Sequence, residues 1–410
     1  KTIVSLKRSF LDTNGAVATA DVHVADAQTD IFSEPFTGDF SERMKQIVSD
    51  LNICSQKGLI EMFDSTIGAS SVTMPLGGKN QLTPTQAMSA KVAADGQCDT
   101  ASLFSYGFDP YLTEKNPMLG SVYAVIMSLA KLTATGGDTN RAWLTLQEYF
   151  ERTTSKQSWG KPLAALLGAW WAQKNMGTPA IGGKDSMSGT FENIHVPPTL
   201  CSFAICTEDA DNVISPEFKQ SNNLLYRVRI ERDEHGMPIF DDVKAKYASV
   251  YQAIKDKKVV SAYAVERGGV LAGIAKMALG NGIGATLNPD NLDELSQKAY
   301  GDIILESGDL SLGYEVIGKT GGDALMMAQE SISLADLQQG FEQPLSSVFP
   351  AYSKSEAEAP NKLYKYTNVY TYSGQKATPT VVIPVFAGTN CEYDSASAFT
   401  RAGANATTLV

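Results

Sequence analysis

The chain is poor in histidine and cysteine and lacks any paired-cysteine motif. Three histidines and five cysteines occur among 410 residues, and the cysteines stand at positions 54, 98, 201, 206 and 391 without a C-x-x-C pair. A structural zinc centre needs clustered Cys and His ligands, and a disulfide framework needs an even set of cysteines. The sequence therefore argues against both, and it favours a reducing, cytoplasmic location.

The chain also lacks an excess of basic residues. Asp and Glu total 45 against 34 Lys and Arg, which gives a formal net charge of −11. A nucleic-acid surface needs clustered Lys and Arg, so we expect no nucleic-acid partner. We also find no apolar run long enough to cross a bilayer and expect no membrane partner. A local basic loop can still bind a phosphorylated small molecule.

Apolar periodicity predicts an α/β (α+β) protein. The clearest helix covers 117–135, where Asn116 is a good N-cap, Pro117 takes the first helical position and an i, i+3, i+4, i+7 apolar stripe follows. Further helices are expected at 141–151, 161–175, 241–257 and 269–279, the last with Gly280 as its C-cap, and strands at 2–6, 17–24, 200–206, 224–231, 303–306 and 314–319.

The same patterns predict five parts along the chain. Residues 1–45 look like an extended lead-in, 46–208 and 209–355 like two α/β domains, and 356–378 like a linker. A short apolar strand, a turn and a helix then indicate the start of a further domain in 379–410. Because the chain opens without a methionine and stops soon after this start, we expect it to be a piece of a longer protein.

One segment, which we expect to be a loop between apolar stretches, has the composition of a phosphate site. Gly182, Gly183, Lys184, Asp185 and Ser186 combine backbone freedom, a cation and a carboxylate within five positions. Successive backbone N–H groups can form a concavity for an anion, lysine supplies charge, and aspartate can hold Mg²⁺. The spacing is not that of the usual P-loop. A glycine-rich turn capped by Asp and Ser side chains explains the same residues.

The amino-acid sequence of this segment resembles that of a known family. GTPAIGGKDSMSGTF, followed by VPPTLCSFAI, is similar to phosphoribosylformylglycinamidine synthase, the large amidotransferase of de novo purine biosynthesis. The stretches at 58–88, 102–125, 144–153 and 159–170 agree with that family in the same order. The resemblance implies a two-domain synthetase half of the aminoimidazole-ribonucleotide-synthetase-like fold, followed by a truncated start of a class I glutamine amidotransferase domain.

The resemblance also implies an activity. The whole enzyme is an ATP-dependent carbon–nitrogen ligase that converts formylglycinamide ribonucleotide and glutamine to the amidine, with Mg²⁺ and ATP as cofactors. The partners of this chain would be the first synthetase half and the glutaminase domain, and the isolated chain would be inactive. The glutaminase triad would lie beyond Val410, so Cys391 is expected to be structural. An alternative is a non-catalytic scaffold half that completes the pseudo-dimer and supports the glutaminase.

Few functional residues of the family have a counterpart at the matching position of this sequence. Segment 182–186 and Asp64 are the candidate phosphate or substrate contacts, although an Asx turn or helix cap also explains Asp64. At an auxiliary nucleotide site the family's metal ligands would fall on Met127, Lys131 and Ala264. None of these suits Mg²⁺, so no metal ligand and no cofactor is assigned to this chain. We hypothesise that Lys131 or Arg267 fills the space of the metal; a misalignment by a few residues is the alternative.

Overall fold

The structure is a computed structural model, and it describes residues 2–13, 19–26, 28, 31–66, 70–94, 98–289, 291–352 and 377–410. The chain divides into two units, 1–353 and 354–410, and each is considered by itself. The first unit contains both of the large sheets. The predicted division near residue 208 separates the strands of one sheet from those of the other, yet both sheets belong to one unit, so the two-domain boundary stays a prediction.

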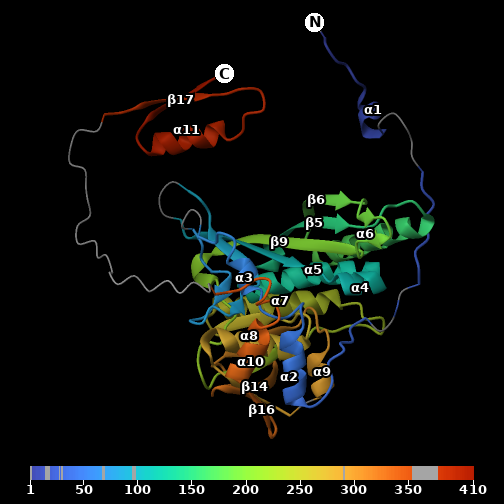
Figure 1. The fold of residues 1–410 in the computed structure, drawn as a ribbon, viewed down its shortest axis with the longest axis vertical. Coiled ribbons are helices and arrows are strands. Elements are labelled where there is room, and N and C mark those ends of the chain that lie inside the picture. The colour runs from blue at the N-terminus through green and yellow to red at the C-terminus, as the bar shows by residue number, and fades with distance from the viewer. Residues whose placement is uncertain are drawn as a thin grey trace. The chain divides into compact units, whose positions relative to one another are not determined.

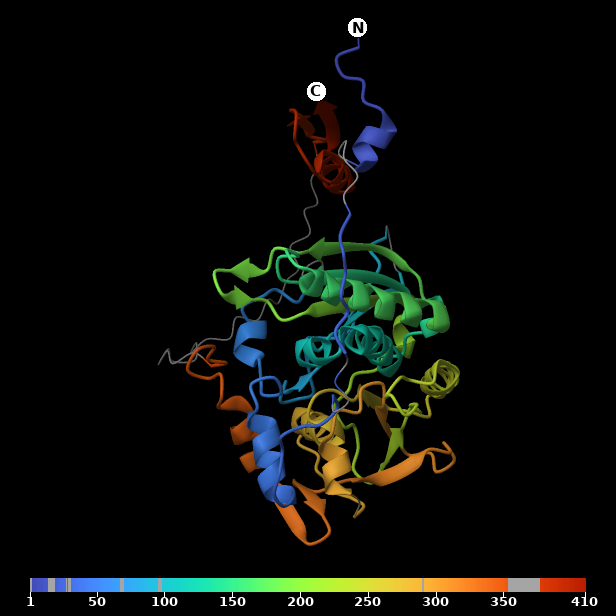
Figure 2. The ribbon, with the colours of Figure 1, turned by 90° about the vertical axis from the view of Figure 1, so that its right-hand side faces the viewer.

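The first sheet has five strands in the order β3-β4-β9-β5-β6. Their bounds are β3 Ala87–Lys91, β4 Thr100–Gly107, β9 Thr199–Asp209, β5 Trp143–Tyr149 and β6 Ala180–Ser186. Only the β5–β6 pair is parallel. Figures 1 and 2 show helices α5 (Pro117–Ala134) and α6 (Lys156–Met176) on one side of this sheet. Alternate residues of β4 are buried on that side, as period-two side-chain alternation requires.

Helix α5 is the centre of the unit, because it lies between the two sheets. The Asn116 side chain accepts a hydrogen bond from the Leu119 N–H at 3.0 Å, so the predicted cap and helix are confirmed. The helix is apolar nearly all round, and its side chains join strands of both sheets in one core. Its 18 residues have the length and hydropathy of a membrane span, contrary to our expectation, but 89% of them are buried in the protein, as in a core helix.

The second sheet has seven strands in the order β11-β13-β10-β14-β12-β15-β16. Their bounds are β10 Leu224–Val228, β11 Ser261–Ala264, β12 Ala285–Leu287, β13 Ile303–Ser307, β14 Glu315–Thr320, β15 Ala324–Met327 and β16 Glu330–Ser333. Only β12 and β15 pair in parallel. Ile303 and Leu305 of β13 pack toward α5, whereas Ile304 packs toward α8 (Gly269–Asn281), so both faces of the sheet are covered.

Helix α8 forms the second core together with α2 (Phe40–Ser49) and α10 (Leu334–Glu342). The predicted lead-in 1–45 therefore ends too late, since Phe40 and Met44 are buried side chains of α2. Helix α7 (Phe240–Lys255) confirms the prediction for 241–257. The helix predicted at 269–279 is also present, but it runs through Gly280 to Asn281 and is capped by Gly282 in the left-handed region.

Three further sequence predictions were wrong. The segment 141–151 is not a helix, because β5 pairs with β9 on one side and β6 on the other. Residues 2–7 and 19–24 form no strand, and α1 (Arg8–Thr13) lies between them.

The remaining predicted elements of the first unit are confirmed. The strands predicted at 200–206, 224–231, 303–306 and 314–319 correspond to β9, β10, β13 and β14, and the helix predicted at 161–175 lies within α6.

The smaller elements of the first unit are short helices and hairpins. They are α3 Lys57–Ile60, α4 Pro110–Lys115, α9 Leu292–Ser296, β1 Leu76–Gly77, β2 Thr83–Pro84, β7 Thr190–Phe191 and β8 Ile194–His195, with single 3₁₀ turns at Thr139–Arg141 and Ala210–Asn212. The strand pairs β1–β2 and β7–β8 are antiparallel.

The second unit is a β–α–β element. Strand β17 (Thr380–Pro384) and helix α11 (Glu392–Arg401) confirm the predicted strand and helix, and β18 (Asn405–Leu409) pairs with β17 in parallel. The sequence did not predict this second strand. Whether the unit begins a glutamine amidotransferase domain stays a prediction. Nearly all of the predicted linker 356–378 lies outside the described residues.

Candidate functional site

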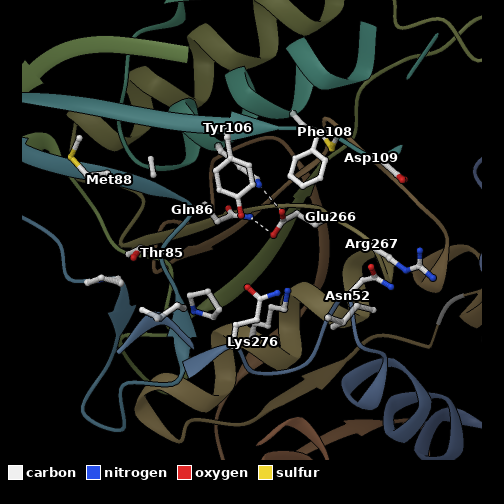
Figure 3. A pocket seen from close by; sticks show the side chains of 18 of the residues that line it. Asn52, Thr85, Gln86, Met88, Tyr106, Phe108, Asp109, Glu266, Arg267 and Lys276 are labelled. Carbon is white, nitrogen blue, oxygen red and sulfur yellow. Dashed lines mark hydrogen bonds and ion pairs between the residues drawn. The ribbon is translucent and has the colours of Figure 1, made fainter. Parts of the chain in front are cut away.

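A cavity of about 770 Å³ opens in the first unit. The residues that line it include Tyr106 from β4, Met127 and Lys131 from α5, Glu266 and Arg267 from the turn that joins β11 to α8, and Lys276 from α8. Figure 3 shows the labelled side chains of Glu266, Arg267 and Lys276 around this opening. Its volume is in the range of small-molecule sites in proteins.

An ion pair between buried Lys131 and half-buried Glu266 closes one wall of the cavity. The ammonium group of Lys131 lies 2.6 Å from a carboxylate oxygen of Glu266 and 3.9 Å from the ring centroid of Tyr106. Glu266 also accepts hydrogen bonds from the Tyr263 hydroxyl at 2.8 Å and from the Gln86 amide at 3.1 Å. Burial raises the pKa of Glu266, but the nearby lysines and these donors outweigh burial and lower it to about 2.

Lys276 is a second buried cation on the same cavity. It is 9% exposed, and burial lowers its pKa although the carboxylate of Glu266 counteracts part of the effect. Among the described residues its ammonium group has no hydrogen bond or ion pair at contact distance. Thr73 and Ser89 also line the cavity, and their hydroxyl oxygens are buried without a hydrogen-bond partner among the described residues.

Arg267 follows Glu266 in the sequence, but its side chain interacts with different acidic residues. Its guanidinium lies 3.8 Å from Glu34 and 3.5 Å from Asp50, and its charge lies 4.9 Å from the ring centroid of Tyr111. Of the two cations in our hypothesis, Lys131 is thus the one that engages Glu266 inside the cavity.

These residues do not fit Mg²⁺, which prefers oxygen ligands. Glu266 is engaged by Lys131, and Met127 offers only a thioether. Ala264 lies in β11 with its backbone N–H donating to Gln86 at 2.7 Å, and it has no ligand atom to offer. The part of the chain that the structure describes holds no group of three or more His, Cys, Asp or Glu that could bind a metal.

Segment 182–186 is a strand, so its prediction as a loop was wrong. It is most of β6, the edge strand that pairs with β5 (Figure 1). Successive side chains of a strand point to opposite faces, so Lys184 and Asp185 diverge. Lys184 lies 4.4 Å from the ring centroid of Tyr149, while Asp185 stands opposite Glu148, whose pKa is raised by burial and by Asp185.

The strand geometry changes what segment 182–186 can do. Its N–H groups cannot converge on one anion as they would in a loop, and none of its residues lines the cavity of the first unit. A side chain at Gly182 would meet open space, whereas one at Gly183 would lie 2.7 Å from the Leu146 carbonyl oxygen. The role of these residues as phosphate contacts stays a prediction.

The other residues that the sequence analysis singled out lie apart from one another in the structure. Asp64 is exposed and lines the cavity, and its contact with a ligand stays a prediction. Cys391 is exposed at the start of α11 with a φ of 65°. Sequence reasoning missed Lys276, although a single lysine within the apolar run 270–279 was a visible signal of a special environment.

The chain is similar in sequence to PurL subunits of phosphoribosylformylglycinamidine synthase. That of Picrophilus torridus is 23% identical over 273 residues, which are 62% of this chain and 36% of the relative. That of Thermoplasma volcanium is 23% identical over 337 residues, 74% of this chain and 44% of the relative. That of Brucella ovis is 22% identical over 361 residues, 80% of this chain and 47% of the relative. The chain thus spans less than half the length of these curated relatives.

The fold is similar to that of solved PurL structures. PurLQS from Thermotoga maritima matches with a TM-score of 0.56 and 12% identity over 81% of this chain and 56% of that chain. T. maritima PurL complexed with FGAR matches with a TM-score of 0.56 and 11% identity over 83% and 57%. No family model matches the chain. In sequence and in fold, this chain therefore resembles the PurL subunit of phosphoribosylformylglycinamidine synthase.

Proposed function

We propose that this chain forms one synthetase half of a phosphoribosylformylglycinamidine synthase. The observation that carries the proposal is the similarity to PurL subunits over 74 to 80% of the chain, together with the PurL-like fold. T. maritima PurL has been solved in complexes with FGAR and with ATP. In the reaction, ATP would phosphorylate the formyl amide oxygen of formylglycinamide ribonucleotide, and ammonia would displace the phosphate. Such phosphoryl transfer depends mainly on positioning and charge stabilisation.

The proposed enzyme needs parts beyond this chain. A further synthetase half would complete the active site, a glutaminase domain would supply ammonia, and Mg²⁺ with ATP would bind in the completed site. We infer a cytoplasmic enzyme and an inactive isolated chain. The exposed side of the five-stranded sheet supports a partner: Phe104 and Phe203 stack there with ring centroids 5.5 Å apart, and Trp143 is 51% exposed. Exposed apolar patches of this kind mark protein interfaces.

The Lys184 side chain lies on that same side of the sheet, which supports its predicted contact with a phosphate. In the register of β5 with β6, Lys184 stands opposite Gln147, which is two and four residues from Thr145 and Trp143 and shares their face. A substrate phosphate held between this face and a partner domain would therefore lie within reach of the Lys184 ammonium group. A non-catalytic scaffold half is the second candidate, and the Lys131–Glu266 pair in place of a metal site favours it.

The two candidates differ in what Lys184→Ala does to the complete enzyme with ammonia as nitrogen donor. A phosphate-binding role predicts a loss of kcat/KM for formylglycinamide ribonucleotide of at least tenfold, because a charge-assisted contact is removed. A scaffold role predicts no change. Lys174→Ala is the matched control, since Lys174 is also an exposed lysine over an aromatic ring, 5.1 Å from the centroid of Trp170.

A further inference from the structure

Helix α6 presents a wide apolar face to solvent. The large side chains on this face recur at spacings of three and four residues, which places them on one side of the helix. Each of them is between 37% and 54% exposed: Trp159, Leu163, Leu166, Leu167, Trp170 and Trp171. The opposite face has small buried residues, among them Ala165 and Ala169, which pack with Ala124 of α5. An exposed apolar face of this kind marks an interaction surface.

The lead-in of the chain already contacts the first turns of this face. The backbone N–H of His23 donates to the carbonyl oxygen of Lys156 at 2.9 Å, and the Asp21 carboxylate lies 2.8 Å from the Lys156 ammonium group. A Cβ at Gly160 would lie 1.9 Å from the His23 carbonyl oxygen, so the two backbones are in close contact. Leu167 follows Gly160 by seven residues and shares its side of the helix. The contact of the lead-in is therefore continuous with the apolar face.

The residues that precede this contact carry apolar side chains of their own. Within 2–11, these large apolar residues are each at least 50% exposed: Ile3, Val4, Leu6, Phe10 and Leu11. Leu11 and Asp21 are ten positions apart, a length of chain that can span up to about 33 Å. The part of α6 from Gly160 to Trp171 is only about 17 Å long. The N-terminal segment can therefore reach the whole apolar face while residues 21–23 keep their contacts.

We propose that residues 2–11 bind along the apolar face of α6, so that this face is the docking surface of the chain's own N-terminal segment. Burial of apolar area on both partners drives the contact. The tether at Asp21 makes the binding intramolecular, which raises the effective concentration of the segment. A second copy of the chain is the competing occupant of the face. The proposal is independent of the proposed ligase activity, because it involves neither the cavity nor segment 182–186.

Tryptophan fluorescence of the full chain tests the proposal. Three of the four tryptophans lie on α6, and Trp143→Phe removes the fourth, so acrylamide quenching in that background reports the exposure of the α6 face. Phe10→Asp/Leu11→Asp should raise the quenching constant about twofold, because indole rings that the segment covers become accessible. Leu310→Asp is the matched control: Leu310 is an 80% exposed leucine that follows β13, and its replacement should leave the quenching unchanged.

Tryptic cleavage gives a second measurement, made from the side of the helix. Leu166→Asp should speed cleavage after Lys7 and Arg8 about tenfold, the effect expected when one leucine loses a buried contact. Cleavage after Lys174 of α6 should stay as slow as in the unaltered chain, which shows that the helix itself remains folded.

The two occupants differ in their dependence on protein concentration. Docking of residues 2–11 predicts a monomer in sedimentation velocity and quenching that is the same at every concentration. Unchanged quenching in Phe10→Asp/Leu11→Asp, with a circular dichroism spectrum like that of the unaltered chain, would overturn the proposal. Unchanged cleavage after Lys7 and Arg8 in Leu166→Asp would also overturn it, as would quenching that falls as a dimer forms.

Discussion

The sharing of Glu266 by two lysines makes a quantitative prediction about stability. Glu266→Gln keeps the shape of the side chain but leaves Lys131, whose side chain is 3% exposed, and Lys276 without a counter-charge. Removing one partner of a buried ion pair costs about 3–5 kcal/mol. The lowering of the Glu266 pKa from 4.5 to about 2 corresponds to about 3 kcal/mol of the free energy of unfolding, which agrees with that range.

Lys131→Met should cost less than Glu266→Gln. After it, Glu266 still has Lys276 nearby and keeps the hydrogen bonds from Tyr263 and Gln86. The double variant Lys131→Met/Glu266→Gln should cost less than the sum of the two single variants, because the residues interact directly.

Urea unfolding followed by the fluorescence of the chain's four tryptophans measures these free energies. Glu114→Gln, at an exposed position, is the control and should change the free energy of unfolding by less than about 0.5 kcal/mol. The reasoning is refuted if Glu266→Gln costs less than about 1 kcal/mol, or if Lys131→Met costs as much as Glu266→Gln.

Three further predictions concern pH, packing and thiol chemistry. Because the pKa of Glu266 is lowered in the fold, its contribution to stability is present above pH 4.5 and is lost as the pH falls toward about 2; the stability difference between the unaltered chain and Glu266→Gln, measured by urea titration, should shrink over that window. Gly168→Ala places a methyl group 2.0 Å from a carbonyl oxygen of α5 and should cost about 1–3 kcal/mol in urea unfolding, whereas Gly182→Ala meets open space and should change it little. Burial raises the pKa of Cys206 to about 12, so iodoacetamide at pH 8 should modify exposed Cys391 first, as peptide mass spectrometry can show; faster modification of Cys206 would contradict its burial.

Local signals explain which elements the sequence predicted well. Asn116 and Pro117 mark the start of α5, and a regular apolar stripe follows, so the helix could be found without knowing its neighbours. Strand β5 was mistaken for a helix because its seven residues carry no cap or turn that excludes one. Its strand form depends on β9 and β6, which lie more than 30 residues away in sequence, and such pairing is not a local property.

The candidate site was predictable only in part. The resemblance directed attention to Met127, Lys131, Ala264 and Arg267, and Met127, Lys131 and Arg267 line one cavity. The composition of 182–186 suggested a loop, because glycine, lysine and aspartate are poor strand formers; pairing with β5 overrides that preference. The charge imbalance at Lys276 could not be derived from sequence, since it depends on which carboxylates lie near a lysine after folding.

The most direct test of the account is the reaction of the complete protein that carries this chain. Formylglycinamide ribonucleotide, Mg-ATP and ammonia are supplied, and formation of the amidine and ADP is followed by chromatography. The account predicts stoichiometric formation of both products, and no product when either ATP or ammonia is left out. Absence of the amidine from a folded, complete protein, with formylglycinamide ribonucleotide unchanged, would contradict the proposed ligase function.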